Sequence, residues 1–231
     1  MKGAMVKQTL ILWTMGLAWA GVLGVSVPVR AESPSDRLAR LTAKFDEMQK
    51  QPDKRVPADV LHRAQGIILL DRTKAGFIFA YQGGGGVAMV RDGRESWSPV
   101  AFLTASEASL GLQIGGEQNF FVILLMTTNA THELTDSTID FGGEARGTAG
   151  DQSSGVEGQA APKDSVLVYC ERSGLYGGAA IKGGAISPDG AANQTYYSQN
   201  VTMDDILFGK KVKPTDAATN LAKKISEYSK K

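Results

Sequence analysis

The middle of the chain alternates short apolar runs with charged or glycine-rich turns, a pattern that predicts β-strands. In residues 66–86, an apolar run is followed by a charged turn at residues 71–74 and by a second, partly aromatic run that ends in four glycines. A related pattern returns in residues 166–185, with its turn at residues 171–173. Each copy predicts a β-hairpin, so the sequence indicates two related β units.

Other strand signals lie between and beside these two copies. Asp-Gly within residues 91–94 predicts the turn of another hairpin that returns through residues 96–98. Residues 120–126 are too few to cross a membrane and too apolar for an exposed strand, so they predict a strand buried on both faces. The remaining predictions are an alternating strand in residues 106–116, a short helix or turn in 127–135, an echo of residues 113–117 in 139–144, a flexible loop in 147–162 and a turn in 187–190.

Amphipathic helical patterns flank the strands at both ends. Ser35 or Asp36 is a suitable N-cap for a helix over residues 36–51. Its apolar face consists of Leu38, Leu41, Phe45 and Met48. A short helix is predicted after Pro57, and a terminal helix starts near Thr215. The apolar face of the terminal helix consists of Ala218, Leu221, Ile225 and Tyr228. Together these patterns predict an α+β fold with a curled antiparallel sheet, built from two related β units and flanked by amphipathic N- and C-terminal helices.

The first 31 residues have the features of a secretory signal. Lys2 and Lys7 precede an uncharged apolar run at residues 10–27, and Val29 and Ala31 place small residues where a signal peptidase recognises them. We therefore expect an exported protein, periplasmic or secreted; the alternative is an uncleaved anchor, since about 18 apolar residues are the lower limit for spanning a bilayer. The predicted segments are the signal (1–31), a helical segment (32–65), a β-rich core (66–207) and a basic C-terminal helix (208–231), the last three forming one domain.

Charge is distributed unevenly along the chain. Of the 25 Lys and Arg residues, three lie in the signal, which leaves 22 against 24 Asp and Glu in the predicted mature protein. Residues 36–74 carry a net charge of +3 and residues 208–231 carry +5, whereas residues 75–207 carry −9. This acidic body argues against nucleic-acid binding.

No group of residues has a catalytic or metal-binding spacing. The four glycines are followed by a strand pattern rather than by Gly-Lys-Ser/Thr and a helix, so they do not predict a phosphate-binding loop. His62, His132 and Cys170 are far apart in the sequence, which argues against a metal site or a serine triad. The adjacent acids Asp204 and Asp205 predict a helix N-terminus. We therefore expect a protein that is not an enzyme and binds no cofactor or metal.

The helix predicted over residues 36–51 is basic as well as amphipathic. Arg37, Arg40 and Lys44 accompany its apolar face, and such a helix can lie on an anionic membrane with its apolar face among the headgroups. The same face can instead pack on the core of its own domain. The pattern leaves both alternatives open.

Motifs along nearly the whole predicted mature chain resemble the SYLF-domain family. They are Val56-Pro57, Lys74-Ala75-Gly76-Phe77, Trp97-Ser98-Pro99, Gly111-x-Gln113-Ile114-Gly115, residues 122–126, Gly174-Leu175 and residues 201–210. Two features depart from the family pattern: Tyr197-Ser198 stands where Phe-Tyr-Gly is frequent, and the N-terminal helix is less basic than in eukaryotic members.

This resemblance implies a lipid-binding module whose basic N-terminal helix recognises phosphatidic acid or phosphoinositide headgroups. The implied partner is an anionic phospholipid membrane, near which each cation contributes about 1 kcal/mol. The implied lipid-binding residues are Arg37, Leu38, Arg40, Leu41, Lys44, Phe45, Lys54 and Arg55. Fungal members of the family are tied to actin, but the predicted signal indicates an exported bacterial branch and argues against an actin partner. Two alternatives remain: a cell-envelope scaffolding or protein-interaction domain without lipid contact, and a hydrolase that uses His132 or the Asp204-Asp205 pair.

Overall fold

The computed structural model describes residues 32–75, 81–93, 96–105, 119–137, 165–171, 174–176 and 186–230. Glu32–Lys231 form one compact unit. The signal, the alternating strand at residues 106–116, the echo at 139–144 and the loop at 147–162 were predicted for residues outside this described part.

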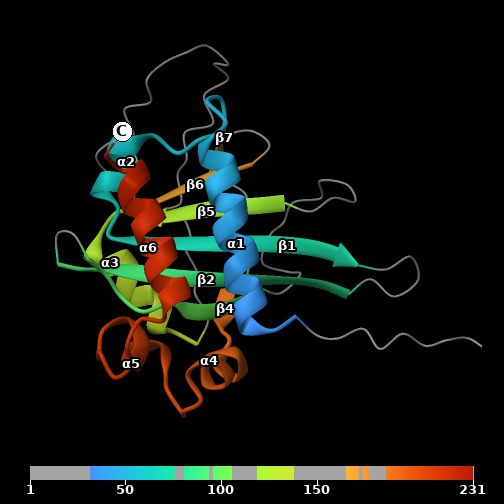
Figure 1. Cartoon of the computed structure of the whole chain (residues 1–231), viewed down its shortest axis with the longest axis vertical. Coiled ribbons are helices and arrows are strands. Elements are labelled where there is room, and N and C mark those ends of the chain that lie inside the picture. Colours follow the sequence, from blue (N-terminus) through green and yellow to red (C-terminus); the bar gives the residue numbers. More distant parts are fainter. Residues whose placement is uncertain are drawn as a thin grey trace, which may run out of the picture. The chain divides into compact units, whose positions relative to one another are not determined.

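The described strands form one antiparallel sheet in the order β7-β6-β5-β1-β2-β4-β8, with β3 paired to β2 (Figure 1). The strands are β1 (Gly66–Ala75), β2 (Tyr81–Asp92), β3 (Ser96–Trp97), β4 (Ala101–Ala105), β5 (Asn119–Leu125), β6 (Val166–Cys170), β7 (Gly174–Tyr176) and β8 (Ile186–Pro188). The pairs β1–β2 and β6–β7 lie on opposite sides of β5; β6 and β7 fall in the second predicted hairpin, whereas β1 runs through the turn predicted for the first. The predicted α+β fold with a curled antiparallel sheet is confirmed.

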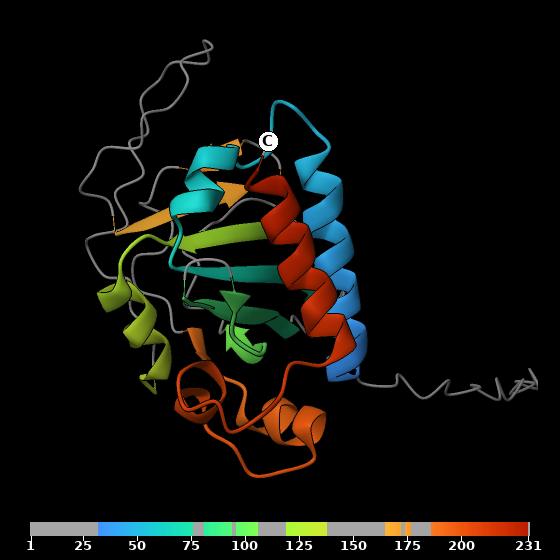
Figure 2. The same cartoon turned by 60° about the vertical axis from the view of Figure 1, so that its left-hand side comes forward.

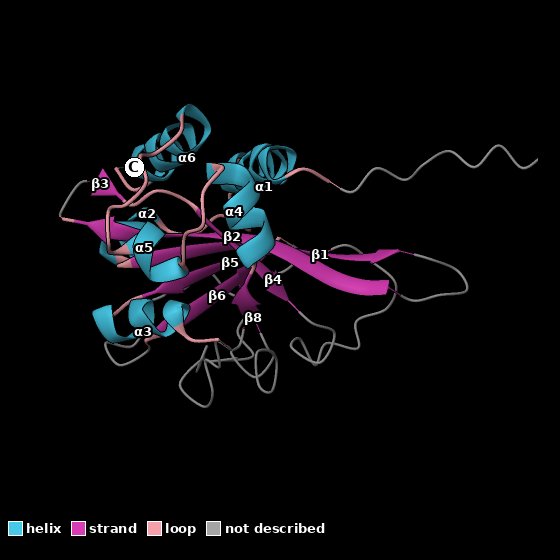
Figure 3. Ribbon diagram, turned by 90° about the horizontal axis from the view of Figure 1, so that it is seen from below, coloured by secondary structure: helices cyan, strands magenta, loops and turns pink. Residues whose placement is uncertain are grey.

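Helices cover both faces of this sheet. On one face lie α1 (Pro34–Gln49), α2 (Ala58–Arg63) and α6 (Asp216–Tyr228); on the other lie α3 (Thr128–His132), the 3-10 turn η2 (Glu133–Thr135) and α5 (Met203–Leu207). The remaining described helix, α4 (Gly190–Tyr197), packs beside β4. Figure 2 shows that α1 and α6, the first and last helices, lie side by side and run in the same direction. Figure 3 shows them on the side of the sheet opposite to α3.

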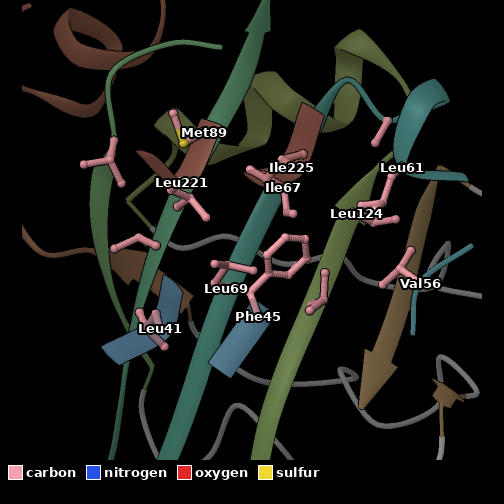
Figure 4. Packing of buried hydrophobic residues seen from close by; sticks show 14 of the residues in the cluster. Leu41, Phe45, Val56, Leu61, Ile67, Leu69, Met89, Leu124, Leu221 and Ile225 are labelled. Carbon is pink, nitrogen blue, oxygen red and sulfur yellow. The ribbon is translucent and has the colours of Figure 1, made fainter. Parts of the chain in front are cut away.

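The core consists of two layers because the side chains of a strand alternate between the two faces. In β1, Ile67 and Leu69 point toward α1 and α6, and Ile68 and Leu70 point toward α5. Figure 4 shows Phe45 of α1 lying over Ile67 and Leu69. From residue 120 to residue 125, β5 is at most 3% exposed, which confirms the prediction of a strand buried on both faces.

One predicted helix boundary shifts because of capping. The α1 helix begins two residues earlier than predicted, since Ser33 rather than Ser35 or Asp36 is its N-cap; the Ser33 hydroxyl accepts a hydrogen bond from the Asp36 N–H at 3.1 Å. Pro34 fits the first helical position because its missing N–H is not needed there.

The charged turn predicted at residues 71–74 is wrong, because β1 continues to Ala75. Asp71 pairs with Gly85 on one side and with Phe120 on the other, inside the sheet. Its side chain faces α1, which supplies two cations. In the sequence, a charge that interrupts an apolar run suggests a turn. The counter-ions that allow Asp71 to stay inside the sheet come from α1, a separate segment of the chain.

The turn predicted at residues 187–190 is also wrong. β8 ends at Pro188, and Asp189 caps α4 by accepting a hydrogen bond from the Ala192 N–H at 3.0 Å. Asp-Gly is common both in turns and at helix starts, so the local pattern did not reveal α4.

Several other local predictions are confirmed. The β2–β3 hairpin turns at Gly93, whose φ of +81° favours glycine. Asp204 and Asp205 lie in the first turn of α5, and Thr215 caps α6. The segment predicted as a short helix or turn is α3 followed by η2.

Candidate functional site

The residues predicted to bind lipid lie on α1 and in the turn that follows it. The three apolar members, Leu38, Leu41 and Phe45, are completely buried on the sheet together with Met48. Their spacing of three and four residues places them on one helix face, which is the face that the core uses. These side chains can reach lipid only if α1 leaves the sheet.

Arg37 connects α1 to the N-cap of α4. Its guanidinium donates to Asp189 Oδ2 at 2.8 Å and lies 5.8 Å from the centre of the Phe102 ring. Gly85 provides the space for this side chain, because a Cβ at that position would lie 2.9 Å from Arg37 Nε. Arg37 is therefore an internal contact, and its side chain is only 16% exposed.

Arg40 and Lys44 neutralise the buried carboxylate of Asp71. The Asp71 side chain is 2% exposed; its Oδ2 accepts from Arg40 Nη1 and, at 3.0 Å, from Lys44 Nζ. Arg40 also binds Glu32 through two hydrogen bonds, of 2.6 and 3.0 Å. The bond to Glu32 and the charge of Asp71 raise the pKa of Arg40. Arg40 and Lys44 are thus paired with acids of the same chain.

Lys54 and Arg55 differ from the other predicted cations. They lie in the turn between α1 and α2, where Lys54 is half-buried and Arg55 is exposed. Within the described part of the chain neither forms an ion pair. Of the predicted lipid-binding residues, these two keep charges that an external anion can approach.

A clasp between α1 and α6 holds the two helices together. Asp46 Oδ1 accepts from Lys224 Nζ at 2.8 Å and from the Tyr228 hydroxyl at 2.9 Å, and its Oδ2 accepts from Lys50 Nζ at 2.7 Å. Lys224 and Lys50 hold the pKa of Asp46 well below its usual range. Phe45 packs against Tyr228 edge to face, with ring centres 6.0 Å apart. The sequence predicted both helices but not this contact between them.

The hollow between α1 and α6 does not have the residues of an active site. It encloses about 300 Å³ and is lined by Leu38, Ala39, Thr42, Ala43, Asp46, Ala217, Asn220 and Lys224. Its one carboxylate is already bound to Lys224, so it offers no pair of groups for acid–base chemistry.

The candidate catalytic residues either face solvent or already have structural contacts. His62 is exposed on α2, and His132 is exposed on α3, where it stacks on the Phe208 ring at 4.5 Å. Asp205 is engaged in the capping box of α5, and Lys211 and Thr202 lower its pKa to about 2. Among the residues that the structure describes, no three His, Cys, Asp or Glu side chains form a metal-binding group, and no helix is long and apolar enough to span a bilayer.

Comparison with known proteins decides the family. The sequence model of the Ysc84 family, described as "Las17-binding protein actin regulator", matches residues 106–228, more than half of the chain. The chain belongs to the Ysc84 family. This confirms the resemblance to SYLF-domain proteins, which are the same family.

Ysc84-family relatives in eukaryotes match most of the chain. "LAS seventeen-binding protein 3" of Saccharomyces cerevisiae is 30% identical over 202 residues, covering 84% of this chain and 44% of the yeast protein. "SH3 domain-containing YSC84-like protein 1" of Homo sapiens is 29% identical over 196 residues, covering 83% of this chain and 57% of the human protein. The chain therefore spans about half the length of these relatives.

The Ysc84 description names binding and regulation, not a reaction, so the family is one of binding domains. It also names actin, so the comparisons give no support to the expectation that actin is not a partner. The family match covers β5 to α6 but not the predicted lipid-binding residues, which all precede residue 106.

Proposed function

We propose that this Ysc84-family chain is a non-enzymatic module that associates reversibly with anionic phospholipid, such as phosphatidic acid or phosphoinositide-like headgroups. The supporting observation is that Lys54 and Arg55 remain without ion pairs in the described structure, while Arg37, Arg40 and Lys44 are bound to internal acids. Each cation near an anionic surface contributes about 1 kcal/mol, so such attachment is reversible.

In this proposal α1 stays on the sheet. Separating it would remove four buried side chains from the core, each stabilised by about 1.5–3 kcal/mol of apolar burial. Insertion into a bilayer would bury those four side chains again, but the apolar face of the sheet that they cover would then be exposed to water. The uncompensated cost of exposing the sheet is of the same order as the total stability of a domain, about 5–15 kcal/mol. Docking through exposed cations is therefore favoured over insertion of Leu38, Leu41 and Phe45.

Vesicle flotation of the protein from Glu32 onward tests this function. We expect recovery with vesicles of phosphatidylcholine and phosphatidic acid, and none with phosphatidylcholine alone. The double variant Lys54→Glu, Arg55→Glu should float less, whereas Lys223→Glu, an exposed change on α6, should float like the parent. Equal recovery on both vesicle types, or none on either, contradicts lipid binding; unchanged flotation of the double variant excludes Lys54 and Arg55 as the contact.

The family description favours a second candidate, a protein-interaction or scaffolding domain without lipid contact. The family is described as a Las17-binding actin regulator, and its yeast relative is named for binding LAS seventeen. Co-sedimentation with purified actin filaments tests the simplest form of this candidate. Sedimentation with filaments that persists in the Lys54→Glu, Arg55→Glu variant, together with no flotation on anionic vesicles, would replace the lipid proposal.

We infer from the predicted signal that the module works outside the cytoplasm, in the periplasm or as a secreted protein. Mass spectrometry of the protein recovered from cell fractions tests this. A chain that begins at Glu32 in the exported fraction is expected, and an intact chain confined to the cytosol contradicts the inference.

A further inference from the structure

The segment after α5, residues 208–213, presents three lysines on a well-fixed turn. The N–H groups of Phe208 and Gly209 donate to the Asp204 carbonyl at 2.9 and 2.8 Å, and the Lys211 N–H donates to the Asp205 carbonyl at 3.1 Å. A Cβ on Gly209 would lie 3.1 Å from the Asp205 Cα, a close approach that glycine accommodates without displacing its neighbour. Val212, 6% exposed, anchors the turn in the core.

The lysines of this turn point into solvent. The side chains of Lys210 and Lys211 are 70% and 65% exposed, and Lys213 is exposed as well. By contrast, Arg37, Arg40 and Lys44 on α1 are 16%, 35% and 21% exposed.

The ion pairs of Lys210 and Lys211 differ in exposure. Lys210 binds Asp92 at 2.8 Å, and the Asp92 side chain is itself 44% exposed; Lys211 binds Asp205 at 2.6 Å, and the Asp205 side chain is 16% exposed. An exposed pair such as Lys210–Asp92 contributes little to stability, so an external phosphate competes readily for Lys210.

Lys210 occupies a backbone conformation that lysine seldom adopts. Its φ is +51°, in the left-handed region that favours glycine and asparagine. A lysine kept in such a position suggests that its side chain serves a purpose beyond local folding.

We propose that Lys210, with Lys211 and Lys213, forms a second contact of this module with the anionic surface of a phospholipid bilayer. This contact rests on the proposed function and adds to it a site that lies 155 residues beyond Arg55 in the chain. It falls within the residues that match the Ysc84 family, whereas Lys54 and Arg55 do not.

The two contacts lie at different ends of the helical layer. Figures 1 and 2 show α5 and the start of α6 at one end, and the ends of α1 and α6 at the other. A flat membrane therefore meets one contact at a time. For this reason the turn is best tested in a Lys54→Gln, Arg55→Gln background, in which the other orientation is weakened.

The test measures partition of this background protein to vesicles of phosphatidylcholine and phosphatidylglycerol, with phosphatidylcholine alone as reference. Lys210→Gly and Lys210→Asn both suit the left-handed backbone and remove one charge. Each should weaken partition roughly five-fold, as expected for one cation at an anionic surface. Asp92→Asn frees Lys210 and should strengthen partition, while Lys223→Gln removes a charge from α6 and should change nothing.

The rival explanation is that Lys210 serves only to hold Asp92. In that case Lys210→Gly and Asp92→Asn would leave partition unchanged and would both lower the urea midpoint. Under our proposal Lys210→Gly keeps or raises the midpoint, since glycine relieves the backbone, and weakens partition.

The outcomes separate the two proposals. Loss of all partition in the Lys54→Gln, Arg55→Gln background, or equal partition of the Lys210 variants and their background, overturns the second contact alone. If the unaltered protein from Glu32 onward fails to bind anionic vesicles, both proposals fall.

Discussion

At the scale of single residues, Asp71 shows how a charge can be part of an apolar sheet. It lies on the α1 side of β1, in line with Ile67 and Leu69, and is almost completely buried. A buried carboxylate is tolerated only when it is paired, and Arg40 and Lys44 supply that pairing. The cations of α1 therefore have a structural role whether or not the protein meets a membrane.

We predict a large loss of stability when both cations are removed. In the variant Arg40→Gln, Lys44→Gln the carboxylate of Asp71 stays buried without a charged partner, which typically costs about 3–5 kcal/mol. Urea denaturation measures this loss. Adding Asp71→Asn should restore part of the stability, because a neutral amide needs no counter-ion.

The matched control for this prediction is Lys54→Gln, Arg55→Gln, which removes two charges from the turn after α1. Since neither residue has an ion pair in the described structure, its effect should stay within about 0.5 kcal/mol. Equal effects of the two double variants would show that Asp71 does not depend on α1.

At the scale of elements, the clasp between α1 and α6 makes stability depend on pH. Lys224 and Lys50 lower the pKa of Asp46 from its ordinary value of 3.8 in the folded protein. Above pH 3.8 the stabilisation is fully present. Below that value the unfolded chain takes up a proton that the folded protein does not, so the stabilisation declines with falling pH.

We predict that Asp46→Asn removes this pH dependence. The difference in unfolding free energy between the parent and Asp46→Asn should be constant near neutral pH and should shrink below about pH 4. Denaturant titrations at a series of pH values measure it. A difference for Asp46→Asn that grows on acidification would contradict the sign.

Local patterns predicted most of the elements but not the contacts between them. The spacing of Leu38, Leu41 and Phe45 identifies α1 and its apolar face, because helical periodicity is a property of neighbouring residues, but it does not say what covers that face. The partner of Arg37 is Asp189, 152 residues away, and that of Arg40 is Asp71, 31 residues away. Such partners are set by the fold, so in the sequence alone these arginines look like unpaired charges.

The candidate contact at Lys210 is likewise a product of the fold. In the sequence, Lys210 is the last residue of the family motif at residues 201–210 and part of a basic C-terminal segment. Its exposure and its left-handed backbone become visible only in the structure. A Gly-Lys-Lys sequence directly after Asp-Ile-Leu-Phe was the one local signal that marked the end of a short helix beside exposed lysines.

At the scale of the whole molecule, we predict that membrane binding does not require α1 to leave the sheet. Ala43→Cys and Asn220→Cys place one thiol on α1 and one on α6, both lining the same hollow. A short bifunctional maleimide can join them, while Cys170 stays buried. The cross-linked protein should float on anionic vesicles as well as the same variant capped with a monofunctional maleimide.

Loss of flotation only after cross-linking would show that the helices must separate. That result would restore the insertion of Leu38, Leu41 and Phe45 into the bilayer as the mode of binding.

The side-by-side packing of the first and last described helices also affects how the chain matures. Asp46 and Lys224, which join α1 to α6, are separated by 178 positions. Contacts over such long separations form slowly, because a large loop must close first. During synthesis, the face of the sheet that α1 and α6 cover therefore stays incompletely buried until α6, near the end of the chain, has been made. A delay of this kind keeps the nascent chain unfolded for longer, and under the proposal that the chain is exported it would favour passage through a translocation channel before folding.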